Sequence, residues 1–317
     1  METIARPAAW KTLVAFAIVY FVWGSTFLAI RVGVREVPPF LLAGLRFLVA
    51  GILLFVWMLS KGTSYPTRRE WAAASFVAVL IFVLDYGLLF WSEQRVPSGL
   101  ASVMMATIPV FMGLLEIIFL RTQQLTLRLT VALIVGICGV AVLMNPSAAF
   151  GEKPIDGMGA AALLIASLSW STATILTRKL PLPNAKAMSS AAQMLAGGVM
   201  LLLVSTILGE CHGFDVGAVS PIAWFALAYL IVAGSIIAFT AYVWLIHHES
   251  PTKVGTYAYV NPVVAVVIGY FLGGEVVGIR TLVGTLLVLV SVVVITTMPA
   301  KKVEAPVVVP ETERVAE

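Results

Sequence analysis

The chain has 317 residues, of which 60% are hydrophobic and 11% are charged. Soluble domains are about half apolar and about a quarter charged, so this composition excludes an ordinary soluble domain and indicates a membrane protein. The formal net charge of +4 comes without a basic stripe interleaved with aromatic residues, so no nucleic-acid partner is expected.

The apolar runs have the length of membrane-spanning helices. In lipid every backbone amide must be hydrogen-bonded within the protein, which leaves helices or a closed barrel. The runs are about 20 residues long without strict alternation, which favours helices over barrel strands. The sequence therefore predicts an all-α membrane protein with ten transmembrane helices in the lipid bilayer. In chain order they are expected at 12–31, 39–59, 71–91, 98–120, 126–144, 158–178, 187–208, 219–244, 252–272 and 279–298.

The lysines and arginines of the short loops predict the orientation, because cytoplasmic loops carry an excess of them. If the N-terminus is cytoplasmic, fourteen fall on the inside: Arg6, Lys11, Lys61, Arg68, Arg69, Arg121, Arg128, Arg178, Lys179, Lys186, Lys253, Lys301, Lys302 and Arg314. Five fall on the outside: Arg31, Arg35, Arg95, Lys153 and Arg280. We therefore expect both termini to be cytoplasmic.

The two halves of the chain echo each other. The segment from Trp23 to Thr26 returns 147 residues later, from Trp170 to Ala173. Each half holds five predicted spans, an odd number, so the second copy enters the membrane from the opposite side. Inverted repeats are typical of secondary transporters, in which the halves exchange conformations and so alternate access to a central site. The expected units are a first repeat at 1–148, a second at 149–299 and a disordered cytoplasmic tail at 300–317.

Two charges fall inside predicted spans of the first half. Arg46 lies seven residues past Pro39, and Asp85 lies six residues before Trp91 on a span that runs the other way. At 1.5 Å per residue both lie roughly 10 Å below the outer surface, so they could pair. Two interpretations stay open: a structural ion pair, or a substrate or proton site. The repeat favours the second, because Gln193 is the counterpart of Arg46 and the second half lacks the pair.

Matched tryptophans and their neighbours are further candidates for binding a substrate. Trp23 lies near Ser25 and Thr26, and Trp170 lies near Thr172. Wide apolar rings in mid-span suit a cavity wall, although helix packing alone is the alternative. The same two interpretations apply to Tyr86.

Pro109 and Pro262 are matched by the repeat near the middle of spans four and nine. A proline inside a helix removes a backbone hydrogen bond and kinks the helix. Either the kinks are static and help packing, or they are hinges that line the cavity. Tyr257 and Asn261 lie one turn apart beside Pro262, where they could bind a polar solute or hydrogen-bond between helices.

Three further features of the sequence bear on metal binding, proton coupling and helix packing. His247 and His248 have no further ligands at metal-site spacing, and no phosphate-binding glycine loop is present, so no metal or cofactor is expected. Glu116 falls near the inner surface, where it either snorkels or couples protons. Small residues at Ala132/Gly136 and Gly284/Ser291 should let spans five and ten approach their neighbours; the oligomeric state stays open.

Four segments carry a resemblance to a known family: Val22 to Thr26, Arg46-Phe47, Val96 to Gly99, and Tyr257 to Val263. Together they resemble the EamA branch of the drug/metabolite transporter superfamily, as found in bacterial inner membranes. The resemblance implies that four spans of each repeat surround a central cavity while the fifth and tenth are peripheral. It also implies export of amino acids or related metabolites. Gly274-Glu275 fits the family pattern after span nine, whereas the first repeat has Arg121-Thr122-Gln123 there.

The leading hypothesis is therefore a secondary transporter of a small amphipathic or aromatic metabolite, with protons as an open coupling ion. A membrane-embedded transferase is the alternative from another class, but it would need paired acids or a histidine–acid set. The histidines lie in predicted loops, so no enzyme activity is expected. A channel or a non-transporting membrane protein is a third hypothesis.

Overall fold

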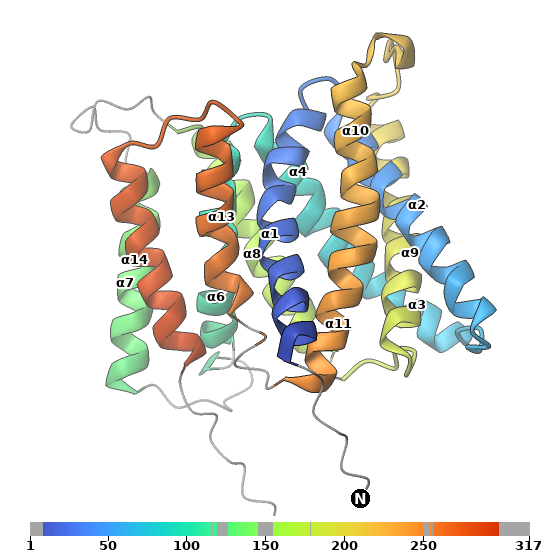
Figure 1. Cartoon of the computed structure of the whole chain (residues 1–317), viewed down its shortest axis with the longest axis horizontal. Helices are drawn as coiled ribbons and strands as arrows, with labels where there is room; N and C mark the ends of the chain where they lie inside the picture. The colour runs from blue at the N-terminus through green and yellow to red at the C-terminus, as the bar shows by residue number, and fades with distance from the viewer. Residues whose placement is uncertain are drawn as a thin grey trace, which may run out of the picture.

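The computed structural model describes residues 9–115, 117–118, 126–144, 155–177, 179–249, 254 and 256–297, with the backbone alone for Val243, Ile246 and His247. Throughout this part of the chain the regular structure is helical (Figure 1). The elements are α1 Ala9–Gly33, α2 Pro39–Ser60, α3 Arg68–Ala78, η1 Val79–Tyr86, α4 Gly87–Glu93, α5 Ser98–Met105, α6 Ile108–Leu115, α7 Leu127–Met144, α8 Gly157–Thr177, α9 Lys186–Ile207, η4 Val216–Ala218, α10 Pro221–Tyr229, η5 Leu230–Ile237, α11 Ala238–His248, α13 Tyr257–Phe271 and α14 Ile279–Thr296.

The prediction of ten spans is confirmed. Within the described ranges, nine helices are long and apolar enough to cross a membrane, and α13 is a tenth, shorter apolar helix. Three spans consist of successive segments: α3, η1 and α4 form the third, α5 and α6 the fourth, and α10, η5 and α11 the eighth. The expected tail at 300–317, the repeat boundary near 148 and Glu116 lie outside the described residues.

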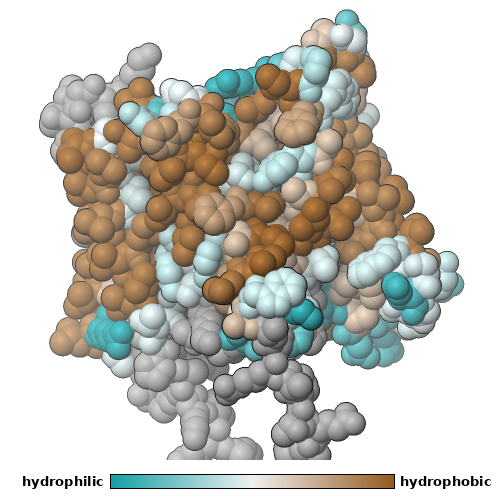
Figure 2. Space-filling model, in the orientation of Figure 1, coloured by the Kyte–Doolittle hydropathy of each residue, from teal (hydrophilic) through white to brown (hydrophobic). Residues whose placement is uncertain are grey.

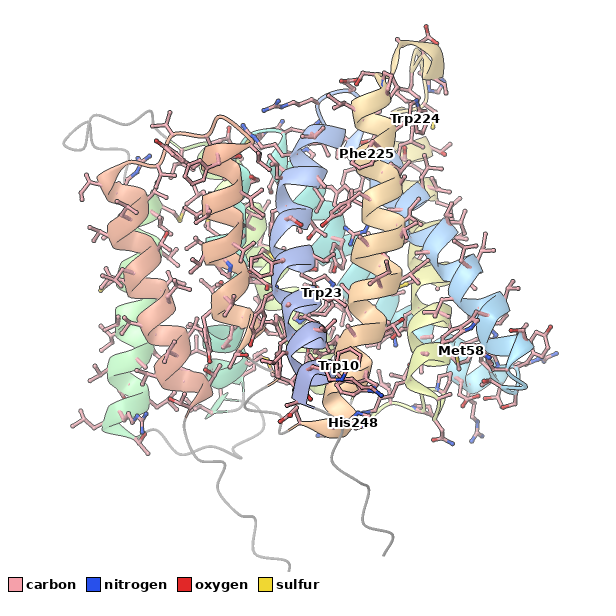
Figure 3. The ribbon with its side chains drawn as sticks, viewed as in Figure 1. Trp10, Trp23, Met58, Trp224, Phe225 and His248 are labelled. Carbon is pink, nitrogen blue, oxygen red and sulfur yellow. The ribbon has the colours of Figure 1, made fainter. Side chains whose placement is uncertain are left out.

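The surface has the polarity of a membrane protein. Figure 2 shows a broad brown belt of hydrophobic side chains, with teal and pale residues gathered toward the two ends of the helices. Trp10 lies near one end of the belt and Trp224 near the other, while Trp23 lies midway (Figure 3). The side chain of Trp10 is 62% exposed, as expected of an aromatic residue at a membrane interface.

α1 begins and α14 ends on the same side of the bundle, at the bottom of Figure 1. We call this the terminal side and the opposite one the distal side. The connections α1–α2, α4–α5, α9–α10 and α13–α14 all lie on the distal side. Which of these sides is cytoplasmic stays a prediction from the lysine and arginine count.

The two repeats pack against each other through α2 and α9, which are related by the repeat. A Cβ on Gly51 would lie 2.8 Å from the backbone nitrogen of Leu195, and a Cβ on Gly198 would lie 2.5 Å from that of Leu48. Gly198 and Leu195 are the counterparts of Gly51 and Leu48 at the repeat offset of 147 residues. The contact is therefore reciprocal, as a pseudo-twofold relation between the repeats requires.

A second matched feature is a π-helical segment in the third span of each repeat. η1 and η5 are each eight residues long and begin 151 residues apart, at Val79 and Leu230. π-helical turns are rare in proteins, and those that do occur are often found at functional sites. Nothing in the local sequence predicted these two segments.

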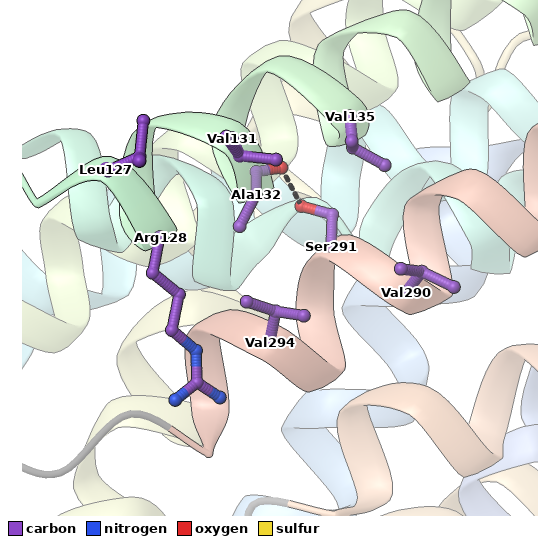
Figure 4. A pocket seen from close by; sticks show the side chains of 8 residues that line it. All are labelled: Leu127, Arg128, Val131, Ala132, Val135, Val290, Ser291 and Val294. Carbon is purple, nitrogen blue, oxygen red and sulfur yellow. Dashed lines mark hydrogen bonds between the residues drawn. The ribbon is translucent and has the colours of Figure 1, made fainter.

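The fifth and tenth spans, α7 and α14, lie at one edge of the bundle, as the resemblance implied, and they pack against each other there (Figure 1). The predicted small residues join them: Ser291 Oγ donates to the Ala132 carbonyl at 2.6 Å, and Gly136 faces Ser291. Figure 4 shows the groove of about 410 Å³ between them. It is lined by Leu127, Arg128, Val131, Ala132, Val135, Val290, Ser291 and Val294, which include none of the predicted site residues.

Candidate functional site

Arg46 lies in the middle of a cage of aromatic rings. Its side chain is 3% exposed, and its guanidinium lies over Phe47, Tyr86 and Phe90, at 4.6, 5.3 and 5.9 Å from the ring centroids. Its Nε donates to Ser235 Oγ at 3.0 Å. Its Nη1 is buried without a hydrogen-bond partner. The cation is therefore desolvated and only partly hydrogen-bonded, an unfavourable state that tends to mark function in a membrane.

The predicted pairing of Arg46 with Asp85 is wrong. Asp85 is 1% exposed, but no oxygen of its carboxyl group lies within ion-pair distance of Arg46, and Asp85 Oδ1 has no hydrogen-bond partner. Equal depth in the membrane does not fix how a helix is rotated about its axis. Here the π-helical segment η1 turns Tyr86, the next residue, toward the arginine instead.

The second repeat contributes the opposite wall of this site through η5. The Trp23 Nε1 donates to the Gly234 carbonyl at 3.1 Å. A Cβ on Gly234 would lie 2.9 Å from the Thr26 methyl and 3.3 Å from Arg46 Nη2. Trp23, Thr26 and Arg46 therefore converge on one glycine, which has no side chain to keep them apart. We call Thr26, Arg46, Phe47, Tyr86, Gly234 and Ser235 the Arg46 site.

Aromatic side chains extend from the Arg46 site in two directions. Trp23 contacts Tyr242 and Tyr257, with ring centroids 5.1 and 5.3 Å apart. On the other side Tyr86 contacts Trp170 edge-to-face at 6.0 Å. The structure thus brings together Trp23, Thr26, Arg46, Tyr86, Trp170 and Tyr257 of the predicted residues.

Ser25 and Thr172 are directed elsewhere. Ser25 Oγ hydrogen-bonds to the Tyr229 hydroxyl at 2.6 Å, on α10 of the eighth span. Thr172 Oγ1 donates to the Leu168 carbonyl of its own helix at 2.8 Å. The alternative interpretation, packing between and within helices, fits these two hydroxyls.

The matched prolines differ in their effect. The fourth span breaks between α5 and α6, just before Pro109, as expected where a proline removes a backbone hydrogen bond. Pro262 instead lies inside α13, which continues through it. Asn261 beside it is buried, and its side-chain Oδ1 has no hydrogen-bond partner, so an amide acceptor is available there. Whether either proline is a hinge stays a prediction.

A polar cluster on the distal side was not predicted. Glu275 accepts hydrogen bonds from Ser98 N, Ser98 Oγ and Gly99 N at 2.7, 2.8 and 3.0 Å, at the start of α5. Arg31 Nε lies 3.3 Å from Glu275 Oε1, and Arg31 Nη1 donates to the Glu93 carbonyl at 3.0 Å. We call Arg31, Glu93, Ser98, Gly99 and Glu275 the distal cluster.

The chain forms the Glu275 contact through two glycines. Gly274 has a φ of +64°, a left-handed conformation that glycine adopts without strain, and it reverses the chain after α13. A Cβ on Gly269 would lie 2.5 Å from Glu275 Oε2. The Gly274-Glu275 and Val96-to-Gly99 segments were noted separately in the sequence, but only the fold joins them.

Two further carboxylates hold helix N-termini of the opposite repeat on the distal side. Glu36 accepts from Ser220 N at 2.6 Å and from Ser220 Oγ at 2.8 Å, at the start of α10. Glu210 accepts from Phe40 N and Leu41 N at 3.4 and 3.0 Å, at the start of α2. The hydrogen bonds from Ser220 lower the pKa of Glu36. With Glu275, three carboxylates thus connect the repeats on this side, each favoured by the positive end of a helix dipole.

Among the described residues no group of three histidine, cysteine, aspartate or glutamate side chains could hold a metal. The His248 ring stacks on Trp244 with centroids 4.2 Å apart, and its Nδ1 lies 2.8 Å from the Trp244 carbonyl oxygen. Figure 3 places His248 at the terminal-side end of α11, away from Trp23.

Comparisons with known proteins agree with this architecture. The model of the EamA-like transporter family matches residues 10–145 and 157–297, one match in each half. The uncharacterized inner membrane transporter YedA of Escherichia coli (strain K12) is 37% identical over 93% of this chain and 94% of its own. The uncharacterized transporter YoaV of Bacillus subtilis (strain 168) is 25% identical over 88% of this chain and 94% of its own. A solved crystal structure with a TM-score of 0.60 and 20% identity, covering 95% of this chain and all of its own, shares the fold.

Proposed function

The chain belongs to the EamA-like transporter family, and on that premise we propose that it moves a small carboxylate-bearing metabolite, such as an amino acid with an apolar or aromatic side chain, across an inner membrane by alternating access. Arg46 would bind the carboxylate. The rings around it would hold the apolar part. Export is the direction that the family resemblance favours, and a distal side that faces outward is the orientation that the loop charges favour.

The single observation that carries this proposal is the incomplete coordination of Arg46. A buried cation in an apolar region needs a counter-charge, and Asp85 does not supply it. A carboxylate oxygen hydrogen-bonded to Nη1 would neutralise the guanidinium and satisfy its unused donor. The carboxylate of the bound metabolite therefore acts as the counter-ion that Arg46 lacks within the protein.

The surroundings of Arg46 support a carboxylate over a phosphate. A phosphate ester carries about two charges and favours several arginines or lysines converging on it. Within the described part of the Arg46 site, Arg46 is the single cation, and its neighbours are rings, a glycine and hydroxyls. Such rings favour an aromatic or aliphatic side chain on the same metabolite.

The distal carboxylates support alternating access. Glu36, Glu210 and Glu275 each bind a helix start of the other repeat, so they connect the repeats on one side of the membrane. Opening that side would require the repeats to part there and these hydrogen bonds to break. The inverted repeat provides the second state, in which the two halves exchange conformations.

Uptake of labelled compounds into proteoliposomes tests the proposal. We expect the wild-type protein to transport at least one compound from a pool of amino acids and aromatic metabolites. Arg46→Gln should reduce its transport by about tenfold or more, because a charged hydrogen bond is lost. Arg46→Lys retains the charge but not the planar set of donors, so its transport should lie between that of the wild type and that of Arg46→Gln.

Arg128→Gln is the matched control, since Arg128 lies on the outer groove of α7 and should not affect transport. Wild-type transport by a folded Arg46→Gln variant would refute the role of Arg46. No transport of any pooled carboxylate by wild-type protein would refute the proposed substrate class.

A further inference from the structure

Glu93 has a buried carboxyl group that receives no hydrogen bond from the described residues. It is the last residue of α4 and is 1% exposed. Both of its carboxyl oxygens are buried without a hydrogen-bond partner. Its backbone carbonyl, by contrast, accepts a hydrogen bond from Arg31. An ionised carboxylate loses its hydration on burial and gains nothing in return here, so the neutral, protonated form fits this environment.

The charged groups around Glu93 do not provide a pairing partner. Arg31 on α1 is engaged by Glu275, whose own oxygens also hold the start of α5. Arg31 and, on α2, Arg46 are the arginines of the helices packed against α4, and neither forms an ion pair with the Glu93 carboxyl group. The other helices packed against α4 add Asp85 and Tyr86 from η1, whereas α5 and α8 carry no titratable side chain.

We propose that Glu93 is a proton-binding site whose occupation closes the distal side. In the state described here the distal cluster is assembled and Glu93 holds its proton. When the repeats part on the distal side, the Glu275 hydrogen bonds to Ser98 and Gly99 break and water reaches the cluster. Glu93 then gives its proton to water and becomes a carboxylate beside the cation Arg31. Closure reverses the step and takes up one proton from the distal solution.

The proposal rests on the alternating access of the proposed function but not on its substrate. Because one proton is linked to closure, the ratio of distal-closed to distal-open protein should change by up to about tenfold per unit of pH. A higher pH on the distal side favours the open state. Transport would thereby respond to the pH gradient without any contribution from Asp85.

Accessibility of a cysteine on the same helix measures this linkage. Leu89 is 3% exposed and lies one turn before Glu93 on α4. Leu89→Cys, in a chain whose exposed Cys138 and Cys211 are replaced by serine, is treated with a membrane-impermeant maleimide from the distal side. Because the thiolate is the reactive form and its fraction rises with pH, the rate is expressed relative to that of a free thiol at the same pH. We expect this relative rate to increase as pH rises. Glu93→Gln, which mimics the protonated form, should remain slow at every pH.

Asp85→Asn is the matched control, because Asp85 is equally buried but lies on η1 outside the distal cluster. It should retain the wild-type pH dependence. If Glu93→Gln keeps that dependence, or Asp85→Asn abolishes it, Glu93 is not the linked proton site. Since no substrate is added, these outcomes differ from a failure of the proposed substrate class.

A second measurement needs no substitution, so it does not depend on whether the variants fold. A hydrophobic carbodiimide reacts with protonated carboxyl groups inside membranes, and mass spectrometry locates the adduct. In the wild-type protein we expect labelling of Glu93 that decreases as pH rises, while ion-paired Glu275 remains unlabelled. An absence of label on Glu93 at neutral and acidic pH would overturn the proposal.

Discussion

At the scale of single residues, the candidate site is built around Arg46, a buried cation whose neighbours are mostly uncharged. Arg46 was predicted from the sequence because a charge in an apolar span is costly. Its partner was not predictable, since Asp85 and Tyr86 are adjacent in sequence and lie at almost equal depth. Packing turns the tyrosine toward the guanidinium and leaves Asp85 Oδ1 without a hydrogen-bond partner.

Gly234 is the residue on which the two walls of the site meet, and it yields a first residue-scale prediction. A methyl group there would lie 2.9 Å from the Thr26 methyl, which must shift, and 3.3 Å from Arg46 Nη2, so Gly234→Ala crowds the guanidinium that hydrogen-bonds to Ser235. Overpacking of this kind costs about 1–3 kcal/mol. We expect the apparent affinity for the transported compound to fall by about tenfold. The affinity is measured as the concentration dependence of uptake.

Gly157→Ala provides the comparison for Gly234→Ala, because no atom lies within 4 Å of a Cβ at that position. Its uptake should match the wild type. Equal uptake by both variants would mean that Arg46 can move without consequence, and the geometry of the site would then not govern binding.

At the scale of elements, hydropathy fixed the spans and small residues fixed the closest helix pairs. The small residues of spans five and ten do allow a close neighbour, as predicted, and that neighbour is the other of the two spans, through Gly136 and Ser291. Local sequence did not indicate η1 and η5, because a π-helical segment depends on how one extra residue is accommodated by neighbouring helices. Both segments contribute to the Arg46 site, through Tyr86 and Ser235.

The reciprocal contact of α2 and α9 predicts that two substitutions in different halves have similar effects. Gly198→Ala would place a Cβ 2.5 Å from the Leu48 nitrogen, and Gly51→Ala would place one 2.8 Å from the Leu195 nitrogen. Because backbone atoms cannot rotate away, each variant must separate the helices, at a cost of about 1–3 kcal/mol. Thermal unfolding in detergent should show both destabilised. If only one of the two variants is destabilised, the two halves of the contact do not contribute equally to stability.

At the scale of the whole molecule, the distal side is held together by carboxylates that connect opposite repeats. Their partners lie far apart in sequence, 177 residues for Glu275 and Ser98 and 184 for Glu36 and Ser220. No periodicity or motif spacing reports such a contact. The loop lysines and arginines, Arg31 among them, predict an orientation, whereas the contact of Arg31 with Glu275 follows only from the fold.

The contact of Glu36 with the other repeat predicts that the stability of the protein depends on pH. Its pKa is lowered in the folded protein by the hydrogen bonds from Ser220. A lowered folded-state pKa means that its stabilising contribution is complete above the usual glutamate pKa of about 4.3. The contribution is lost as pH falls through the lower, folded-state pKa.

We therefore expect the melting temperature of the wild-type protein to fall more steeply on acidification than that of Glu36→Gln, whose amide does not titrate. The comparison is made by thermal unfolding between neutral pH and pH values below the usual glutamate pKa. Parallel curves for the two proteins would show that the hydrogen bonds to Ser220 do not contribute to stability.

The sequence by itself determined the ten spans and the duplication, and it indicated Arg46 as a candidate site residue. These follow from hydropathy, repetition and the cost of a charge in lipid, which are local properties of the chain. The tertiary structure alone decided that Tyr86 faces Arg46, that Gly234 closes the site and that Glu275 holds α5 while Glu93 is left without a partner. The physical reason is that the rotation of each helix and the meeting of distant loops depend on packing between elements, which no single segment encodes.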